Sequence, residues 1–71
     1  MSGKESVEVT VELRRDDPKK EAIAVYDGKD DDDGKEIWVW LPRSQIDVTP
    51  KAGKVIIVTM PEWLANKKGL I

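Results

Sequence analysis

The residues with most binding potential are Trp38 and Trp40, which stand two positions apart just before a Pro-Arg-Ser-Gln turn. In a β-strand successive side chains point to opposite faces, so the two indole rings share one face and the aliphatic residues beside them take the other. Exposed indoles can stack on nucleic-acid bases, at about 1–3 kcal/mol per base, or contact apolar side chains of a protein partner. This pair is therefore the leading candidate binding site.

The sequence leaves open whether that face is exposed. A C-terminal helix carrying Trp63 and Leu64 could cover Trp38 and Trp40 as a second core layer. Alternatively both indoles form an open platform, or one lies under the helix and the other is partly exposed.

Polar residues flank the tryptophans and complete the candidate set. Arg43 and Lys54 could supply cations beside the indoles, and Gln45 offers a donor on the turn. Ser44 and Gln45 have a second explanation, because such residues also satisfy backbone groups around a proline. The predicted partner-binding residues are Trp38, Trp40, Arg43, Gln45 and Lys54.

The segment from Asp27 to Glu36 is strongly acidic and invites comparison with a calcium loop. Placing Gly34 at the invariant sixth position of an EF-hand loop puts Lys29 first and Trp40 twelfth, where an acid and a bidentate Glu are required. The register fails, so we predict a solvated hairpin tip with neither metal nor cofactor.

The composition offers little to catalysis. The chain contains no cysteine and no histidine, which excludes disulfides, thiol nucleophiles, histidine bases and the usual zinc sites. Ser44 has no base near it in sequence, and clustered aspartates in a loop lack the desolvated setting that shifts a pKa usefully. We predict that the protein is not an enzyme.

Length and charge set further limits. Seventy-one residues form one domain, whose core rarely contributes more than roughly 3–5 kcal/mol net. The charged fraction of 37% is compatible with a heat-adapted source, and the net charge of −2 lacks the basic excess usual in nucleic-acid-binding domains. The longest apolar run is residues 55–58, so we expect a cytoplasmic protein without a signal peptide or membrane span.

Apolar periodicity predicts a mainly β domain over residues 7–71, preceded by a disordered tail over residues 1–6. Short loops and the absence of a crossover helix favour a small five-stranded antiparallel barrel or bent sheet, SH3-like or OB-like. An open α+β sheet with the helix across one face is the alternative. The predicted strands are residues 7–13, 21–26, 36–41, 46–48 and 54–59, with a tight or 3₁₀ turn at 43–45.

One short C-terminal helix is predicted over residues 60–68. The sequence Thr59-Met-Pro-Glu62 matches a capping box, in which the Thr hydroxyl accepts from the third helical N–H. Gly69 fits a left-handed stop, which lets Leu70 fold back on Leu64 or Ala65.

Two segments carry distinctive motifs: residues 40–46, Trp-Leu-Pro-Arg-Ser-Gln-Ile, and residues 61–70, which contain Pro-Glu-Trp-Leu-Ala and Lys-Gly-Leu. Together they resemble a group of small proteins encoded by bacteriophages, prophages and other mobile elements. The similarity covers residues 21–71, and Trp38 and the aspartates at 30–33 depart from the family's pattern. Members accompany phage replication and recombination genes, so the resemblance implies a nucleic-acid context.

We therefore expect a non-enzymatic accessory protein that binds single-stranded nucleic acid or a nucleoprotein through the Trp face. The alternative is a protein-interaction module, an inhibitor or adaptor, that uses the same aromatic patch on a nucleic-acid-processing protein. In that case the acidic loop could mimic phosphates. The sequence leaves the oligomeric state open.

Overall fold

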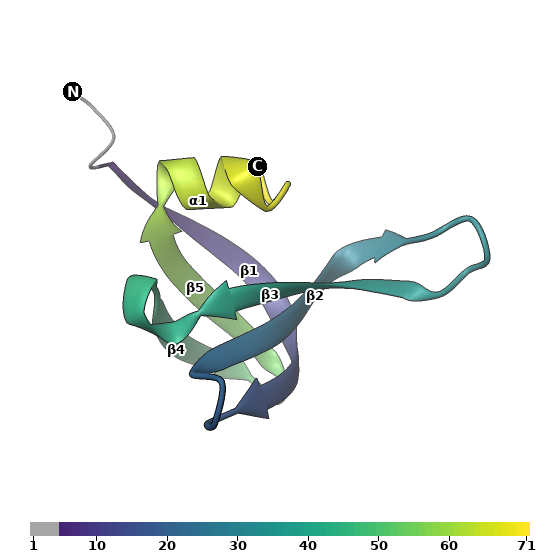
Figure 1. The fold of residues 1–71 in the computed structure, drawn as a ribbon, viewed down its shortest axis with the longest axis horizontal. Coiled ribbons are helices and arrows are strands. Elements are labelled where there is room, and N and C mark those ends of the chain that lie inside the picture. The colour runs from purple at the N-terminus through teal and green to yellow at the C-terminus, as the bar shows by residue number, and fades with distance from the viewer. Residues whose placement is uncertain (1–4) are drawn as a thin grey trace.

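A computed structural model describes residues 5–71 as one antiparallel sheet with a short helix at its C-terminal end (Figure 1). The elements in chain order are β1 (Ser6–Asp17), β2 (Ala22–Asp30), β3 (Glu36–Pro42), the 3₁₀ turn η1 (Arg43–Gln45), β4 (Asp47–Ala52), β5 (Val55–Pro61) and α1 (Glu62–Lys67). The mainly β fold with five antiparallel strands, the 3₁₀ turn and the short C-terminal helix are thus confirmed. The predicted tail lies outside the described residues at positions 1–4, and β1 already begins at Ser6.

The strand order β3-β2-β1-β5-β4 places β3 and β4 at opposite edges of the sheet. In a flat sheet the axes of these edge strands would lie about 19 Å apart, since neighbouring strands are spaced by about 4.8 Å. Residues 43–46 alone join the two strands, and the 3₁₀ turn within them rises only about 2 Å per residue. The short connection therefore requires a strongly bent sheet. No ladder joins β3 to β4 within residues 5–71, so the sheet is not closed into a barrel.

The core lies on the concave face of this sheet. Alternating residues of β1 and β5, among them Val11, Val58 and Met60, point into it together with Ile23, Val25 and Leu41. The predicted one-sided apolar alternation of β1 is confirmed by this burial pattern. The opposite face of the sheet is called the outer face below.

Both long strands are irregular. In β1 the register shifts between Leu13 and Arg15. Leu13 pairs with Val25 and Arg15 with the next residue of β2, Ala24, so Arg14 is an extra residue in β1. Such a bulge interrupts the alternation of side chains on its strand. In β2 the register shifts between Tyr26 and Asp30, and beyond this point β2 and β3 continue as an arm that extends away from the rest of the molecule (Figure 1).

The helix begins later than predicted, and the capping box is wrong. Thr59 lies within β5, paired with Glu8, and the residue before the helix is Pro61, whose side chain makes no capping hydrogen bond. The N–H of Glu62 instead donates to the carbonyl of Glu5, at 2.8 Å. A proline suits this position because Pro61 is still extended, with a φ of −60° that the proline ring favours, and pairing of β5 with β1 continues up to it.

The predicted stop at the other end is confirmed. Gly69 has a φ of +73°, its N–H donates to the carbonyl of Asn66, and the N–H of Leu70 donates to that of Ala65. These two bonds define a Schellman motif. Leu70 is partly buried and packs against the core cluster, to which Leu64 and Ala65 belong. None of the described residues belongs to a helix long and apolar enough to cross a membrane.

Candidate binding site on the outer face

Trp38 and Trp40 are both exposed, with 41% and 38% of their surface accessible. Neither lies under the helix, since α1 packs against β1 and β5 while the tryptophans lie on β3, at the far edge of the sheet. The open platform is therefore the arrangement that the structure adopts. The second-layer and intermediate arrangements are both wrong.

Sheet register determines the neighbours of the two indoles, because residues paired across antiparallel strands share a face. Trp38 is opposite Tyr26 and Trp40 is opposite Ala24. Ala24 is fully buried although it lies on the outer face, so larger side chains beside it cover it. Trp38, Trp40 and Tyr26, which share this side of β2 and β3, are called the aromatic face.

The bulge in β1 brings two consecutive arginines to this face. Arg15 is paired with Ala24 and so points to the outer face, while Arg14 is the extra residue and lies over the Tyr26 ring, 4.8 Å from its centroid. Strict alternation would have sent one of the two to the opposite face. The bulge thus concentrates positive charge beside the aromatic rings.

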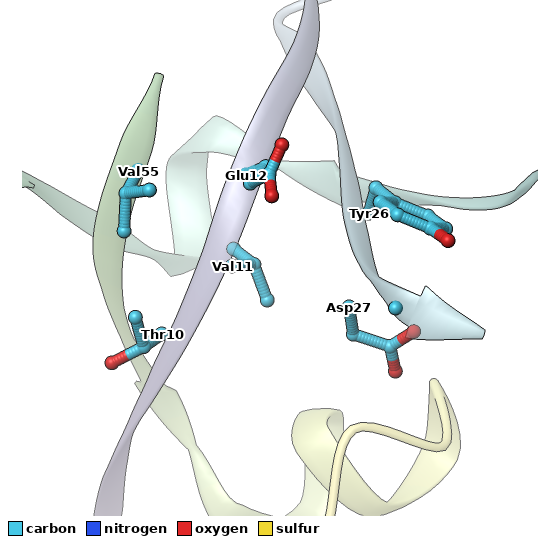
Figure 2. Close-up of a pocket in the computed structure, with 7 residues that line it drawn as sticks. Thr10, Val11, Glu12, Tyr26, Asp27 and Val55 are labelled. Atoms are coloured by element: carbon cyan, nitrogen blue, oxygen red, sulfur yellow. The ribbon is translucent and has the colours of Figure 1, made fainter. Parts of the chain in front are cut away.

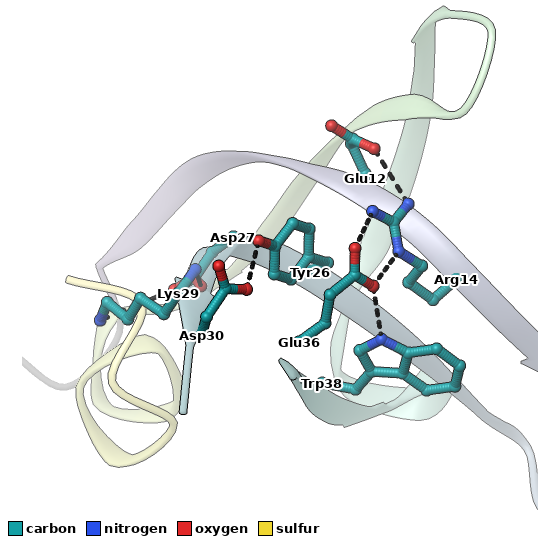
Figure 3. A network of polar contacts seen from close by, with 8 residues as sticks. All are labelled: Glu12, Arg14, Tyr26, Asp27, Lys29, Asp30, Glu36 and Trp38. Atoms are coloured by element: carbon teal, nitrogen blue, oxygen red, sulfur yellow. Dashed lines mark hydrogen bonds and ion pairs between the residues drawn. The ribbon is translucent and has the colours of Figure 1, made fainter. Parts of the chain in front are cut away.

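A network of ion pairs and hydrogen bonds holds Arg14 in place (Figure 3). Its Nε and Nη2 donate to the two carboxylate oxygens of Glu36, at 2.8 and 2.9 Å, and its Nη1 donates to Glu12. The Trp38 indole N–H donates to the same Glu36 carboxylate, at 3.0 Å. This charged network therefore fixes the orientation of the Trp38 indole through its N–H group.

The network shifts the pKa values of its members. Hydrogen bonds first from Arg14 and then from Trp38 lower the pKa of Glu36 to about 2. The Tyr26 hydroxyl donates to Asp30 at 2.6 Å, and chiefly for that reason the pKa of Tyr26 is raised to about 12. The ionic form of Glu36 and the neutral form of Tyr26 are thus the stable ones over a wide pH range.

The charge beside the aromatic face differs between its two ends. At the Trp40 end, the Lys20 ammonium lies 5.7 Å from the indole centroid, which is within cation–π range. Arg15 lies across Ala24 from the same indole. At the Trp38 end the carboxylates of Glu12, Glu36 and Asp30 outnumber the one guanidinium of Arg14. The face is therefore basic beside Trp40 and acidic beside Trp38.

The structure does not bring the predicted cations to the tryptophans. Arg43 forms an ion pair with Asp16, whose opposite residue in β2 is the core residue Ile23, so the pair lies on the other side of the sheet from the indoles. Lys54 is in the turn before β5, with β1 and β2 between it and β3. Gln45 is exposed at the end of η1, beyond the end of β3.

The acidic segment forms the arm's tip, as the predicted hairpin requires. Asp31 organises the turn, because its Oδ1 accepts from the N–H groups of Asp33 and Lys35, each at 2.9 Å. Lys29 ties the arm to the end of α1 through a 2.7 Å bond to the Gly69 carbonyl. Among residues 5–71 there is no group of three or more acidic side chains placed to hold a metal ion.

A shallow pocket lies where β1 and β2 part (Figure 2). Pairing between these strands begins at Glu12 and Tyr26, and the pocket occupies the space beside Val11, Asp27 and Gly28. Its volume of about 250 Å³ is below the roughly 300–1,000 Å³ usual for small-molecule sites. The pocket therefore offers less for ligand binding than the aromatic face.

Trp63 is the third exposed indole, with 46% of its surface accessible. Trp63 does not form a second core layer over Trp38 and Trp40, because Leu64 and Ala65 are the buried residues of α1. In a helix of under two turns one side faces the core, and Trp63 falls outside it. It stands apart from the aromatic face, on a different element.

Sequence reasoning missed four residues of the site, Arg14, Arg15, Lys20 and Tyr26. Tyr26 is placed opposite Trp38 by a register in β2 that shifts between Tyr26 and Asp30, and no local pattern in the sequence shows this shift. Arg14 and Arg15 could not be predicted, because a bulge determines which face of the sheet they lie on. The sequence Leu-Arg-Arg-Asp-Asp contains no signal for a bulge. Lys20 lies more than ten residues from Trp40 in sequence and meets it only through the hairpin.

Comparison of the chain with protein-family models, with curated proteins and with solved structures found no match. The candidate site therefore has to be interpreted from its own chemistry.

Proposed function

We propose that this protein is a non-enzymatic accessory protein that binds single-stranded nucleic acid across the aromatic face. The observation that carries the proposal is the exposure of Trp38 and Trp40 on one face, with Lys20 and Arg15 beside Trp40. Stacking rings next to cations are the features by which sheet surfaces bind single strands.

The spacing of the two indoles suits successive bases. Residues two apart in a strand are separated by about 6.7 Å, so one base can lie on each ring. Tyr26, beside Trp38, extends the apolar surface, although Arg14 already occupies a position over its ring. We assign base stacking to Trp38 and Trp40 and phosphate contact to Arg15 and Lys20.

The resemblance of residues 40–46 and 61–70 to phage and mobile-element proteins is a further reason for this proposal. The family's members accompany replication and recombination genes, where single strands are produced. In that setting a small domain can bind exposed strands without acting on them.

Fluorescence titration tests the proposal. An oligonucleotide of about ten thymidines at low salt should quench tryptophan emission, and Trp40→Ala should weaken binding by about 1–3 kcal/mol. Trp63→Ala is the matched control, because it removes an exposed indole from α1 and should leave affinity unchanged. Absence of quenching at tens of micromolar oligonucleotide would contradict the proposal.

The salt dependence tests the phosphate contacts. Lys20→Gln and Arg15→Gln should each reduce the slope of log affinity against log salt by about one, whereas Lys54→Gln should not change it. An unchanged slope in all three variants would mean that neither cation contacts a phosphate.

One observation favours a second candidate, a protein-binding module on the same surface. Arg14 is already neutralised by Glu36 and Glu12, and Tyr, Trp and Arg are the residues that dominate protein interfaces. A protein partner held by the indoles would bind with little dependence on salt, which separates this candidate from nucleic-acid binding.

A further inference from the structure

The two edges of the sheet differ in how they are protected against pairing. The β4 edge carries Asp47, Pro50 and Lys51, the kinds of residue with which proteins block further strands. The β3 edge has five consecutive apolar residues, Ile-Trp-Val-Trp-Leu, between Glu36 and Pro42. Such an unprotected apolar edge is a template for another strand.

Hydrogen bonds at both ends of β3 determine which backbone groups reach that edge. Arg43 donates its N–H to Glu21 on the β2 side, and Lys35 accepts there from the N–H of Asp31. The backbone N–H and C=O groups of successive residues in a strand point to alternate sides. In β3 those of the odd-numbered residues therefore point to β2, and those of the even-numbered residues point to the free edge. The N–H and C=O groups of Trp38 and Trp40 therefore point to the free edge. Pro42 is also at an outward position, where its missing N–H breaks no bond to β2.

The sequence of β3 is symmetric about Val39. Reading outward from it in both directions gives Trp and then an aliphatic residue, Ile37 on one side and Leu41 on the other. In an antiparallel pair of two such strands centred on Val39, Trp38 is opposite Trp40 of the other copy on the outer face. Aromatic pairs of this kind are among the most favourable cross-strand contacts.

The same register also matches the backbone. In this register, residues whose backbone groups point to the free edge are opposite one another. Trp38 of one copy and Trp40 of the other therefore exchange backbone hydrogen bonds, and the Glu36 N–H donates to the Pro42 carbonyl. A register centred on position 38 or 40 leaves one of these outward positions without an opposite residue in β3. The symmetric register is therefore the one that uses the whole edge.

From this self-complementarity we propose that the β3 edge binds a second copy of this chain, in an antiparallel pair centred on Val39. The two sheets join into one, and four indoles meet along the seam on the outer face. Ile37, 45% exposed, also lies on this edge strand, and association along the edge covers it. This proposal does not depend on nucleic-acid binding.

Cysteine cross-linking tests the register. The chain has no cysteine, so Val39→Cys introduces a sole thiol at a partly buried position, with a residue of similar size. At a non-hydrogen-bonded antiparallel pair the Cα atoms lie about 4.5 Å apart, within the range that a disulfide spans. Mild oxidation should give a covalent dimer that reductant reverses. Thr49→Cys on the β4 edge is the control and should remain monomeric.

Sedimentation equilibrium without nucleic acid tests the association itself. The wild-type chain should show a concentration-dependent dimer, and Ile37→Lys should weaken it about a hundredfold, tenfold from each symmetry-related contact. Thr49→Lys, which adds the same charge to the other edge, should not change it. The proposal is overturned if the wild-type chain has the mass of a monomer at every concentration and Val39→Cys gives no more cross-linked dimer than Thr49→Cys. The partner of the β3 edge would then be a strand of a different protein.

Discussion

Arg14 lies over the ring of Tyr26, with the guanidinium carbon 4.8 Å from the ring centroid, because β1 carries one more residue than β2 at this point. The bulge turns Arg14 to the outer face, where Glu36 holds it through two hydrogen bonds. This stack and the Glu36 bond to Trp38 link β1, β2 and β3 on the exposed side of the sheet.

Acid should destabilise the fold through Glu36. Its pKa is about 2 in the folded chain against an ordinary 4.5, so the ionised form stabilises the fold above about pH 4.5. That contribution should be lost as the pH falls from about 4.5 through about 2. Denaturant melts across this pH range give the free energy of unfolding as a function of pH. This free energy should fall less steeply with acid in Glu36→Gln than in the wild type. Equal slopes in the two proteins would mean that Arg14 does not hold Glu36.

Alkali should destabilise the fold through Tyr26. Its folded pKa of about 12 exceeds the ordinary 10, so its contribution to stability is complete below about pH 10 and is lost as the pH rises through about 12. Tyr26 is the one tyrosine in the sequence, so phenolate absorbance reports it directly. Asp30→Asn should move the titration toward the ordinary value. A wild-type midpoint near 10 would contradict the Tyr26 to Asp30 hydrogen bond.

Leu64, and not Trp63, should hold α1 on the sheet. Leu64 is 3% exposed, so Leu64→Ala should cost about 2–5 kcal/mol in the free energy of unfolding. Trp63→Ala removes a half-exposed ring and should cost no more than about 1 kcal/mol. Urea melts of the two variants make the comparison. A larger loss of stability for Trp63→Ala than for Leu64→Ala would contradict the assignment of Leu64 as the residue that holds α1.

Gly69→Ala should cost about 1–2 kcal/mol, because its φ of +73° is in the left-handed region that other residues disfavour. An added Cβ at this position meets no atom within 4 Å, so the cost comes from the backbone alone. Gly69→Asn, which tolerates this conformation better, should lose less stability. Equal losses for Ala and Asn in thermal melts would point to a steric cause instead.

Local patterns were enough to predict that five strands form, with the 3₁₀ turn and the helix stop, but β1, β2 and β4 extend well past their predicted ends, to Asp17, Asp30 and Ala52. The alternation of valines in β1 and the Gly69-Leu70 ending are each determined by neighbours within a few residues, and the structure follows them. The start of α1 shows where such reasoning fails. Thr59 has the sequence of a cap, but its pairing with Glu8 in β1 extends β5 past it, and ladder bonds outweigh one capping bond.

The candidate site divides in the same way. The sequence by itself determined that Trp38 and Trp40 share a face, since a strand's period of two requires it. Tertiary structure alone decided that this face is open, because α1 packs on the core side of the sheet while Trp38 and Trp40 point to the outer face. It also decided which cations stand beside the indoles. Arg15 and Lys20 reach Trp40 through a bulge and a hairpin, and both depend on pairing between strands far apart in the chain, which no local pattern records.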